Sequence, residues 1–441
     1  MAEGGKLSGM FRALHHPNYR LFFMGQGISL IGTWMERIAM SWLVYRLTDS
    51  ALLLGMVSFC SLVPSFILGP FAGVISDRFD RHRILLITQA LFMLQASIMA
   101  ALVLLDVVQI WHILALSTFL GLVNAFDTST RQAFVIELVE NRKDLSNAIA
   151  LNSSMFNVAR LVGPSVAGVL IAAIGEGACF TINALSYIFV IGSLLRMRLK
   201  PFVPVKEERR VWQQLQEGVK YTFSFAPIRA LILVVAAMSL LGMPFSVLMP
   251  VFARDVLGGD ASTMGALMGF TGVGALGGAL FLAPRKSVVG LSKVIVVASL
   301  LFGGGLVIFS FTRVLWLSLL FMMLTGFGMI VQMASCNTIL QTIVDDDKRG
   351  RVMSFYSMAS LGMAPFGSLL AGAVADRIGV PYTLLGCGIL ILLTIVPFAT
   401  QLPRLRQMVQ PIYQRLGILP EIATGLQSAS NLTAPGREVS P

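Results

Sequence analysis

Residues 69–83 read GPFAGVISDRFDRHR and form a short charged turn between two long apolar runs. The charged residues of this turn are Asp77, Arg78, Asp80, Arg81 and Arg83. Three arginines beside the end of a spanning run favour a cytoplasmic position for the turn. Gly69, Pro70 and Gly73 are small or helix-bending residues, which allow close packing or kinks inside a bilayer. The stretch therefore predicts two membrane-spanning helices that reverse at this turn.

The composition predicts an integral membrane protein. Of the 441 residues, 56% are hydrophobic and 12% are charged, whereas a soluble protein carries about 25% charged residues. The first 20 residues contain no apolar core of the length found in a cleavable signal peptide. Periodicity and length predict twelve transmembrane helices, at residues 20–44, 51–75, 84–105, 110–138, 146–174, 178–198, 226–252, 262–283, 293–311, 315–343, 352–378 and 382–400.

The formal net charge of +11 would suit a nucleic-acid-binding protein, but the distribution of the charges does not. Most Lys and Arg residues fall in the turns on one side of the predicted spans. The other side and its span ends hold Arg46, Arg254, Arg313 and Arg377. Such a bias sets the orientation of a membrane protein. We therefore expect both termini and residues 199–225 in the cytoplasm, and no nucleic-acid partner.

The sequence carries no pattern typical of a metal site, an ATP site or an enzyme. The cysteines lie singly in apolar runs, at Cys60, Cys179, Cys336 and Cys387. The four histidines are scattered, and no phosphate-binding GxxxxGK[ST] loop is present. No nucleophile and base converge in the sequence. We expect no metal, no cofactor and no catalysis of covalent chemistry.

The two halves of the chain repeat each other. One set of matches, at a constant shift, pairs Pro17, Gly32 and Gly55 with Pro227, Gly242 and Gly265. A second set pairs Trp111, Gly121 and Val139 with Trp316, Gly326 and Val344. We therefore expect an N-terminal six-helix half at 1–198, a polar linker at 199–225, a C-terminal half at 226–400 and a cytoplasmic tail at 401–441.

The turn at 69–83 resembles the signature between helices 2 and 3 of the major facilitator superfamily. That signature is a glycine, three residues, Asp-Arg, two residues and then basic residues, and it is matched by Gly73, Asp77, Arg78, Arg81 and Arg83. Asp80 stands where the family usually has glycine. Residues 11–55, FRALHHPNYRLFFMGQGISLIGTWMERIAMSWLVYRLTDSALLLG, are similar to the enterobactin-exporter-like subgroup, also called transmembrane secretion effectors.

This resemblance implies two pseudo-symmetric six-helix halves that rock against each other around a site at mid-membrane. It also implies proton-driven export of small molecules across a bacterial inner membrane. In such a transporter the turn at 69–83 acts as a gate, which locks the inner side when the protein opens outward.

Ionisable groups inside spans are costly and mark functional pathways. Glu36 has no cation four residues away, so it is the first candidate for a proton carrier. Asp127 has Arg131 one turn away, at the spacing of an ion pair, and is the second candidate. Arg37, Arg131 and Arg160 are expected to be charge partners of the carboxylates. Two alternatives stay open: a purely structural Asp127–Arg131 pair, and an Arg160 that binds either helix carbonyls or Asp127.

The predicted substrate cavity takes polar residues and methionines from both halves. Its members are Gln26, Ser29, Thr33, Met40, Asn124 and Asn157 in the first half and Ser239, Met243, Ser246, Gln332, Asn337 and Gln341 in the second. Several share one helical face, by steps of three and four residues. In the repeat, Ser246 corresponds to Glu36 and Gln332 to Asp127. The second half thus lacks the charges, which predicts ion handling in the first half and an amphipathic or apolar substrate.

These observations predict a monomeric secondary active exporter of small amphipathic organic molecules, siderophore-like or drug-like, that works by proton antiport. Two other functions are compatible with the sequence. One is a lipid or lysophospholipid flippase. The other is a membrane binding or scaffold protein without transport, in which substrate flux would not depend on Glu36.

Overall fold

The computed structural model describes residues 11–139, 141–199, 219–285 and 287–418, and within these ranges it contains helices and no β-strand. The first group of helices is η1 (Arg12–His15), α2 (Pro17–Thr48), α3 (Ala51–Arg78), α4 (Arg81–Leu104), α5 (Ile110–Glu137), η2 (Arg142–Asp144), α6 (Leu145–Ile174) and α7 (Glu176–Leu195). Local sequence sets several of the ends. Pro17 occupies the first turn of α2, and Ser50 and Asp80 cap α3 and α4 with their side chains.

The second group is α9 (Ala226–Gly242), α10 (Phe245–Val251), η3 (Phe252–Val256), α11 (Ala261–Leu282), α12 (Leu291–Phe311), α13 (Leu315–Ile343), α14 (Asp346–Gly362), α15 (Ala364–Ile378) and α16 (Val380–Arg415). Two of its spans are interrupted. Pro244 separates α9 from α10, and Pro365 stands in the first turn of α15, just after α14 ends. Proline lacks the N–H that a continuous helix needs at such positions.

The predicted all-α fold with twelve spanning segments is confirmed, because each predicted span coincides with one helix or with one interrupted pair. Eleven described segments are long and apolar enough to cross a membrane. The exception is α2, whose polar residues, Glu36 among them, lower its mean hydropathy. The last span extends beyond the predicted end at residue 400, since α16 continues to Arg415 through Pro403 and Pro411. Most of the predicted linker and the last part of the tail lie outside the described residues.

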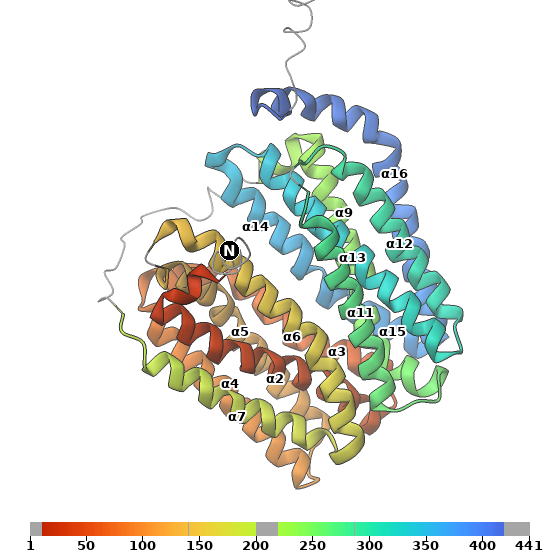
Figure 1. The fold of residues 1–441 in the computed structure, drawn as a ribbon. Coiled ribbons are helices and arrows are strands. Elements are labelled where there is room, and N and C mark those ends of the chain that lie inside the picture. The colour runs from red at the N-terminus through yellow and green to blue at the C-terminus, as the bar shows by residue number, and fades with distance from the viewer. Residues whose placement is uncertain (1–10, 140, 200–218, 286, 419–441) are drawn as a thin grey trace, which may run out of the picture.

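Figure 1 shows the two groups as two inclined bundles. They meet where α3 packs on α15 and α6 packs on α11. Glycines bring these helices together: a Cβ on Gly55 would lie 2.6 Å from the carbonyl oxygen of Ser368, and one on Gly265 would lie 2.8 Å from Cα of Gly168. We call the end of the molecule at which α2 begins and α16 ends the terminal end, and the opposite one the far end.

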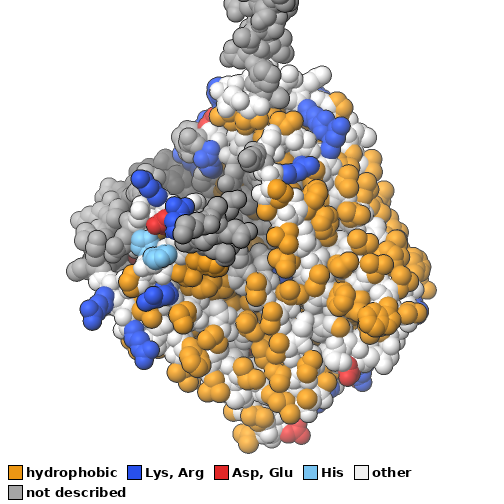
Figure 2. All heavy atoms as spheres, in the orientation of Figure 1, with side chains coloured by type: hydrophobic (Ala, Val, Ile, Leu, Met, Phe, Trp, Pro, Cys, Tyr) orange, Lys and Arg blue, Asp and Glu red, His pale blue; other side chains and the backbone are white. Residues whose placement is uncertain are grey.

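Side-chain chemistry of the surface matches a membrane setting. On the face drawn in Figure 2, Lys and Arg gather mainly near the terminal end, and hydrophobic side chains cover most of the area below them. Large apolar residues such as Leu280, Phe189 and Leu393 are more than half exposed. Such extensive apolar exposure is stable in lipid and would drive aggregation in water. The chain is therefore a multi-span membrane protein.

Candidate functional site

The far end is held shut by Asp376 at the end of α15. Its Oδ1 accepts hydrogen bonds from Ser50 Oγ at 3.1 Å and from the backbone N–H groups of Ala51 at 3.1 Å and Leu52 at 3.4 Å. The first N–H groups of a helix have no partner within that helix. A carboxylate of the second group therefore caps α3, a helix of the first group.

A second set of contacts lies beside this cap. Arg254 Nη1 lies 2.7 Å from Asp49 Oδ1, and its guanidinium lies over the ring of Tyr45, 5.6 Å from the centroid. The hydroxyl of Tyr45 donates to Asp255. Tyr45 and Asp49 belong to the first group and Arg254 and Asp255 to the second. These bonds join the two groups at the far end.

The terminal end of α3 is not packed in the same way. A Cβ added to Gly69 or Gly73 would meet nothing within 4 Å. Phe71 is 62% exposed and Phe79 is 60% exposed. The last turns of α3 thus stand clear of the second group, whereas the far end is joined by the contacts above. We call the region between the two groups on the terminal-end side of those contacts the open space.

The predicted gate residues lie at this open end. Asp80, in the place of the usual glycine, begins α4 by accepting a hydrogen bond from the N–H of His82, and Arg83 lies 3.5 Å from it. Arg81 forms an ion pair with Glu137 of α5. Both contacts stay within the first group. Arg78 is exposed at the end of α3, and the side chain of Asp77 is outside the described part.

On the wall of the space, two arginines lie against one tryptophan. The guanidinium of Arg37 is 4.8 Å from the ring centroid of Trp34, and that of Arg160 is 5.9 Å from it. A Cβ on Gly163 would clash with Trp34, so glycine at 163 lets α2 and α6 approach. Arg160 Nη2 also lies 3.8 Å from Met329 Sδ of α13, which places the cluster between the two groups.

Glu36, the sequence neighbour of Arg37, bonds to α7 instead of forming an ion pair with this cluster. It is 5% exposed, and its Oε2 accepts a hydrogen bond from Asn183 of α7. Among the described residues, its Oε1 has no hydrogen-bond partner. Gln95 of α4 lies close enough to interact with it, and the Gln95 amide likewise has no partner in the described part of the chain. Glu36 therefore sits in a buried polar pocket inside the first group.

Asp127 is fully buried and lies in a different network. Arg131 Nη2 is 2.5 Å from its Oδ2, and Thr88 and Gln89 of α4 donate to its Oδ1 at 3.0 and 2.8 Å. The ion pair predicted from the spacing is thus present. Asp127 does not pair with Arg160, and among described residues neither Arg37 nor Arg160 forms an ion pair with a carboxylate.

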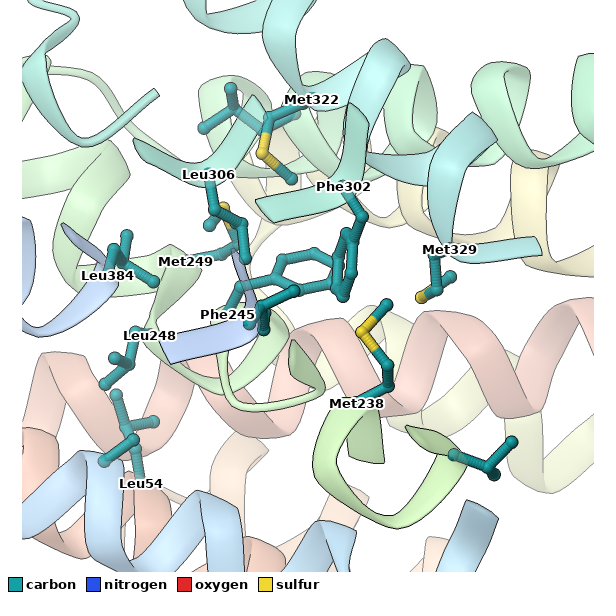
Figure 3. Close-up of a cluster of buried hydrophobic side chains, with 14 of the residues drawn as sticks. Leu54, Met238, Phe245, Leu248, Met249, Phe302, Leu306, Met322, Met329 and Leu384 are labelled. Carbon is teal, nitrogen blue, oxygen red and sulfur yellow. The ribbon is translucent and has the colours of Figure 1, made fainter. Parts of the chain in front are cut away.

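The second group contributes a methionine-rich recess to the facing wall; Met238, Phe302 and Met329, which line it, belong to the cluster of buried hydrophobic side chains drawn in Figure 3. The recess is a shallow depression with a free volume of about 10 Å³, and it is lined by Met238, Ser239, Met243, Phe302, Met329, Gln332 and Met333. Gln332 is fully buried; its amide donates to Cys336 Sγ at 3.7 Å, and its Oε1 has no partner among described residues. Ser239 donates to the carbonyl of Ser360 at 2.8 Å. The recess is therefore apolar with one unsatisfied acceptor.

The other predicted cavity residues divide by exposure. Gln26, Ser29 and Met40 are buried in helix packing. Thr33, Asn124, Asn157, Ser246 and Asn337 are partly exposed, and Gln341 is exposed. Several of these bond to residues three or four positions earlier in the chain: Asn157 donates to Ser153 O, Ser246 to Met243 O and Gln341 to Asn337 Oδ1. This structure gathers only part of the predicted set around the open space.

Sequence reasoning did not single out Asp376, Trp34 or Asn183. A signal for Asp376 exists: the pattern AG-x-x-x-DR occurs at 72–78, in the turn quoted first, and again at 371–377. A lone amide inside an apolar run marks Asn183. Trp34 carries no such signal, because its role depends on which helix lies opposite.

Comparison with known proteins agrees with this architecture. A model of the transmembrane secretion effector family matches residues 8–417. The staphyloferrin A transporter of Staphylococcus aureus is 28% identical over 367 residues, which cover 82% of this chain and 91% of that protein. The multidrug efflux pump Tap of Mycolicibacterium fortuitum is 26% identical, covering 87% and 93%. Macrolide efflux protein A of Streptococcus pyogenes is 24% identical, covering 86% and 95%.

Solved structures share the fold at low identity. A bacterial homologue of the human lysosomal transporter Spinster, in an inward-facing and unoccupied conformation, aligns with a TM-score of 0.68 and 13% identity, covering 89% of this chain and 98% of that one. A POT family transporter in complex with 5-aminolevulinic acid aligns with a TM-score of 0.70 and 10% identity, covering 88% and 96%. The chain therefore belongs to the transmembrane secretion effector family of the major facilitator superfamily.

Proposed function

We propose that this protein exports small organic molecules by alternating access and is driven by proton exchange. The observation that carries the proposal is the asymmetry of the space between the two groups, which Asp376 and its neighbours close at the far end and which opens at the terminal end. A carrier must close one end before it opens the other. The names of its relatives, a siderophore transporter and two efflux proteins, support export of small organic molecules.

The positive-inside bias supports a cytoplasmic terminal end. In that orientation the structure is open to the cytoplasm, the state in which an exporter loads its substrate. The cell membrane of a bacterium is the setting we propose, with the monomer as the working unit.

We assign proton exchange to Glu36. Glu36 is buried, has a hydrogen-bond donor in Asn183 and forms no ion pair among the described residues, and an ionisable group at such a place in a span marks a functional pathway. Asp127, by contrast, is paired with Arg131 and accepts hydrogen bonds from Thr88 and Gln89. Asp127 then orders the site, and Glu36 changes its protonation during the cycle.

The test is transport by the purified protein in proteoliposomes. Radiolabelled staphyloferrin A and a radiolabelled macrolide are offered on the terminal-end side, with and without an imposed pH gradient. We expect at least one of the probes to accumulate against its concentration gradient, and only when the pH gradient is present. Accumulation that ignores the pH gradient would overturn proton coupling, and absence of flux for every small molecule offered would favour a binding or scaffold protein.

A lipid flippase is a second candidate, and one observation favours it. An apolar groove with an empty volume of about 580 Å³ runs between α2 and α7, with Ile28, Leu185 and Phe189 among its lining residues. These three side chains are about half exposed, so the groove faces the lipid. The test is flux of a fluorescent lysophospholipid in the same proteoliposomes. Flux of this lipid faster than flux of the soluble probes would favour the flippase over the exporter.

A further inference from the structure

Trp34, Arg37 and Arg160 form a cluster, here called the Trp34 cluster, that contains more positive charge than the surrounding residues neutralise. Arg37 and Arg160 both face the same indole ring, and their charges lie close enough to act on each other. Like charges held together away from bulk water repel strongly. One arginine on the ring would be sufficient for a packing contact. The second adds repulsion, so packing alone does not account for the pair.

The nearby carboxylates are occupied elsewhere. Glu36 is next to Arg37 in sequence and attracts it electrostatically, but its carboxylate accepts a hydrogen bond from Asn183 of α7 and forms no ion pair with either arginine among the described residues. Asp127 is held by Arg131, Thr88 and Gln89. The pair therefore has no fixed counterion among the described residues, which leaves its donors free for an anion from outside.

The pair can be reached from the open space. Arg37 is exposed although the residues on either side of it, Glu36 and Ile38, are buried. Arg160 is partly exposed, and its Nη2 lies 3.8 Å from Met329 Sδ. Met329 lines the recess of the second group. An anion held by both arginines would thus touch the methionine-rich wall opposite.

We propose that Arg37 and Arg160 bind the carboxylate or other acidic group of the transported molecule, and that its apolar part packs against the methionine-rich wall opposite. The proposal rests on the transport function above and names its substrate class, an amphipathic organic anion. Guanidinium groups match acidic groups through paired hydrogen bonds. Methionine side chains adapt to varied apolar shapes. Organic cations should be rejected, because the site already holds uncompensated positive charge.

Anion and proton occupy separate places in this arrangement. Arg37 faces Trp34 and the open space, whereas Glu36 faces α7. The anion and the proton therefore need not displace each other from a shared side chain. Exchange would then arise because the anion-bound protein and the protonated protein are the forms that change conformation. It would not require the anion and the proton to compete for one charged group.

Binding by the purified full-length protein in lipid nanodiscs tests the proposal. Equilibrium dialysis with 2-naphthoate, 2-naphthamide and 2-naphthylmethylamine compares an anion, a neutral molecule and a cation on the same ring. We expect the wild type to bind the naphthoate at least about tenfold more tightly than the amide, as one charge-assisted contact implies, and the amine more weakly than both. Equal affinity for acid and amide would overturn the site, and this comparison needs no variant.

Substitutions locate the effect. Arg37→Gln and Arg160→Gln should each weaken naphthoate binding about tenfold or more and leave amide binding nearly unchanged, with Arg160→Lys between wild type and Arg160→Gln. Arg229→Gln is the control, because Arg229 is exposed and donates to Phe223 O at the terminal end. Size-exclusion profiles and unfolding temperatures establish that each variant is folded. Unchanged naphthoate affinity in both folded glutamine variants would overturn the assignment.

Flux of the same probes separates this proposal from the transport function. Naphthoate binding that depends on Arg37 and Arg160, without flux of any probe in proteoliposomes, would keep the anion site and overturn transport. Flux of the amide and the amine as fast as that of the naphthoate would keep transport and overturn the anion site.

Discussion

Asp376 accepts a hydrogen bond from the backbone N–H of Ala51 at 3.1 Å, and this contact joins the end of α15 to the beginning of α3. The two helices run antiparallel, since Ala51 approaches Gly372 and Gly55 approaches Ser368. Each helix carries AG-x-x-x-DR at its C-terminal end, at 371–377 and at 72–78. The copy at 371–377 contacts α3 at the far end, whereas a Cβ added to Gly73 of the copy at 72–78 would meet nothing within 4 Å. We infer that the two copies are engaged alternately as the protein changes state.

Replacing Asp376 with Ala should open the far end. The change removes the carboxylate that accepts hydrogen bonds from Ser50, Ala51 and Leu52. Loss of a helix cap costs about 1 kcal/mol. This cost shifts the ratio of far-end-closed to far-end-open molecules about fivefold. Spin labels at Asp106 and Asp260, which are exposed at the far end of the two groups, report the opening as a longer distance. Asp345→Ala is the control, because the described contacts of Asp345 lie within the second group. Equal distance distributions in wild type and Asp376→Ala would contradict the role of Asp376.

Replacing Asp77 with Asn should favour the state seen here and slow transport without loss of folding. The acidic residue at the end of α3 is expected to meet a helix N-terminus of the second group when the terminal end closes, and the variant loses the charge of that contact. Labels at Lys143 and Arg404 follow the terminal end. Asp80→Asn, which changes a cap inside the first group, is the control. If the label distances match wild type, the turn serves only to orient the chain in the membrane.

Glu36→Gln should abolish accumulation driven by a pH gradient and retain substrate binding and downhill exchange. Glutamine keeps an acceptor for Asn183 but cannot take up and release a proton. Glu176→Gln is the control, because Glu176 is a buried carboxylate paired with Arg46 at 2.8 Å, outside the pathway. Undiminished uphill transport by Glu36→Gln would exclude Glu36 and leave Asp127 as the remaining candidate in the first half.

Asp127→Asn should lower stability. Asparagine still accepts from Thr88 and Gln89, but Arg131 loses its counterion. Breaking a fully buried pair costs about 3–5 kcal/mol; we expect about 2 kcal/mol here, because Arg131 is 24% exposed. Thermal unfolding in detergent measures the change. Part of the loss should return in Asp127→Asn with Arg131→Gln, and an unfolding temperature equal to that of wild type would show that the pair does not contribute to folding.

Orientation is tested by labelling with a membrane-impermeant maleimide in a variant without native cysteines. Asp260→Cys should react from outside intact cells, because Asp260 is exposed at the far end. Lys206→Cys, in the predicted cytoplasmic linker, should react only after permeabilisation. Reaction at position 206 from outside would reverse the orientation inferred from the basic residues.

Sequence by itself determined the helices, because an apolar run long enough to cross the bilayer has only the helix as a way to satisfy its backbone. It also determined the Asp127–Arg131 pair, since residues four apart on one helix are neighbours wherever that helix packs. The positions of the ionisable groups in the spans were equally readable, because such residues stand out against apolar surroundings.

Only the tertiary structure decided what those groups face. Periodicity placed five residues on one face of α2, Gln26, Ser29, Thr33, Glu36 and Met40, but all except Thr33 are buried, and Glu36 bonds to α7. Arg37, on the border of that face, reaches the open space with Arg160. A helix's own period tells which residues point the same way. Whether that direction holds a neighbouring helix, a cavity or lipid depends on contacts between segments more than a hundred residues apart, such as Asn183 with Glu36 and Met329 with Arg160.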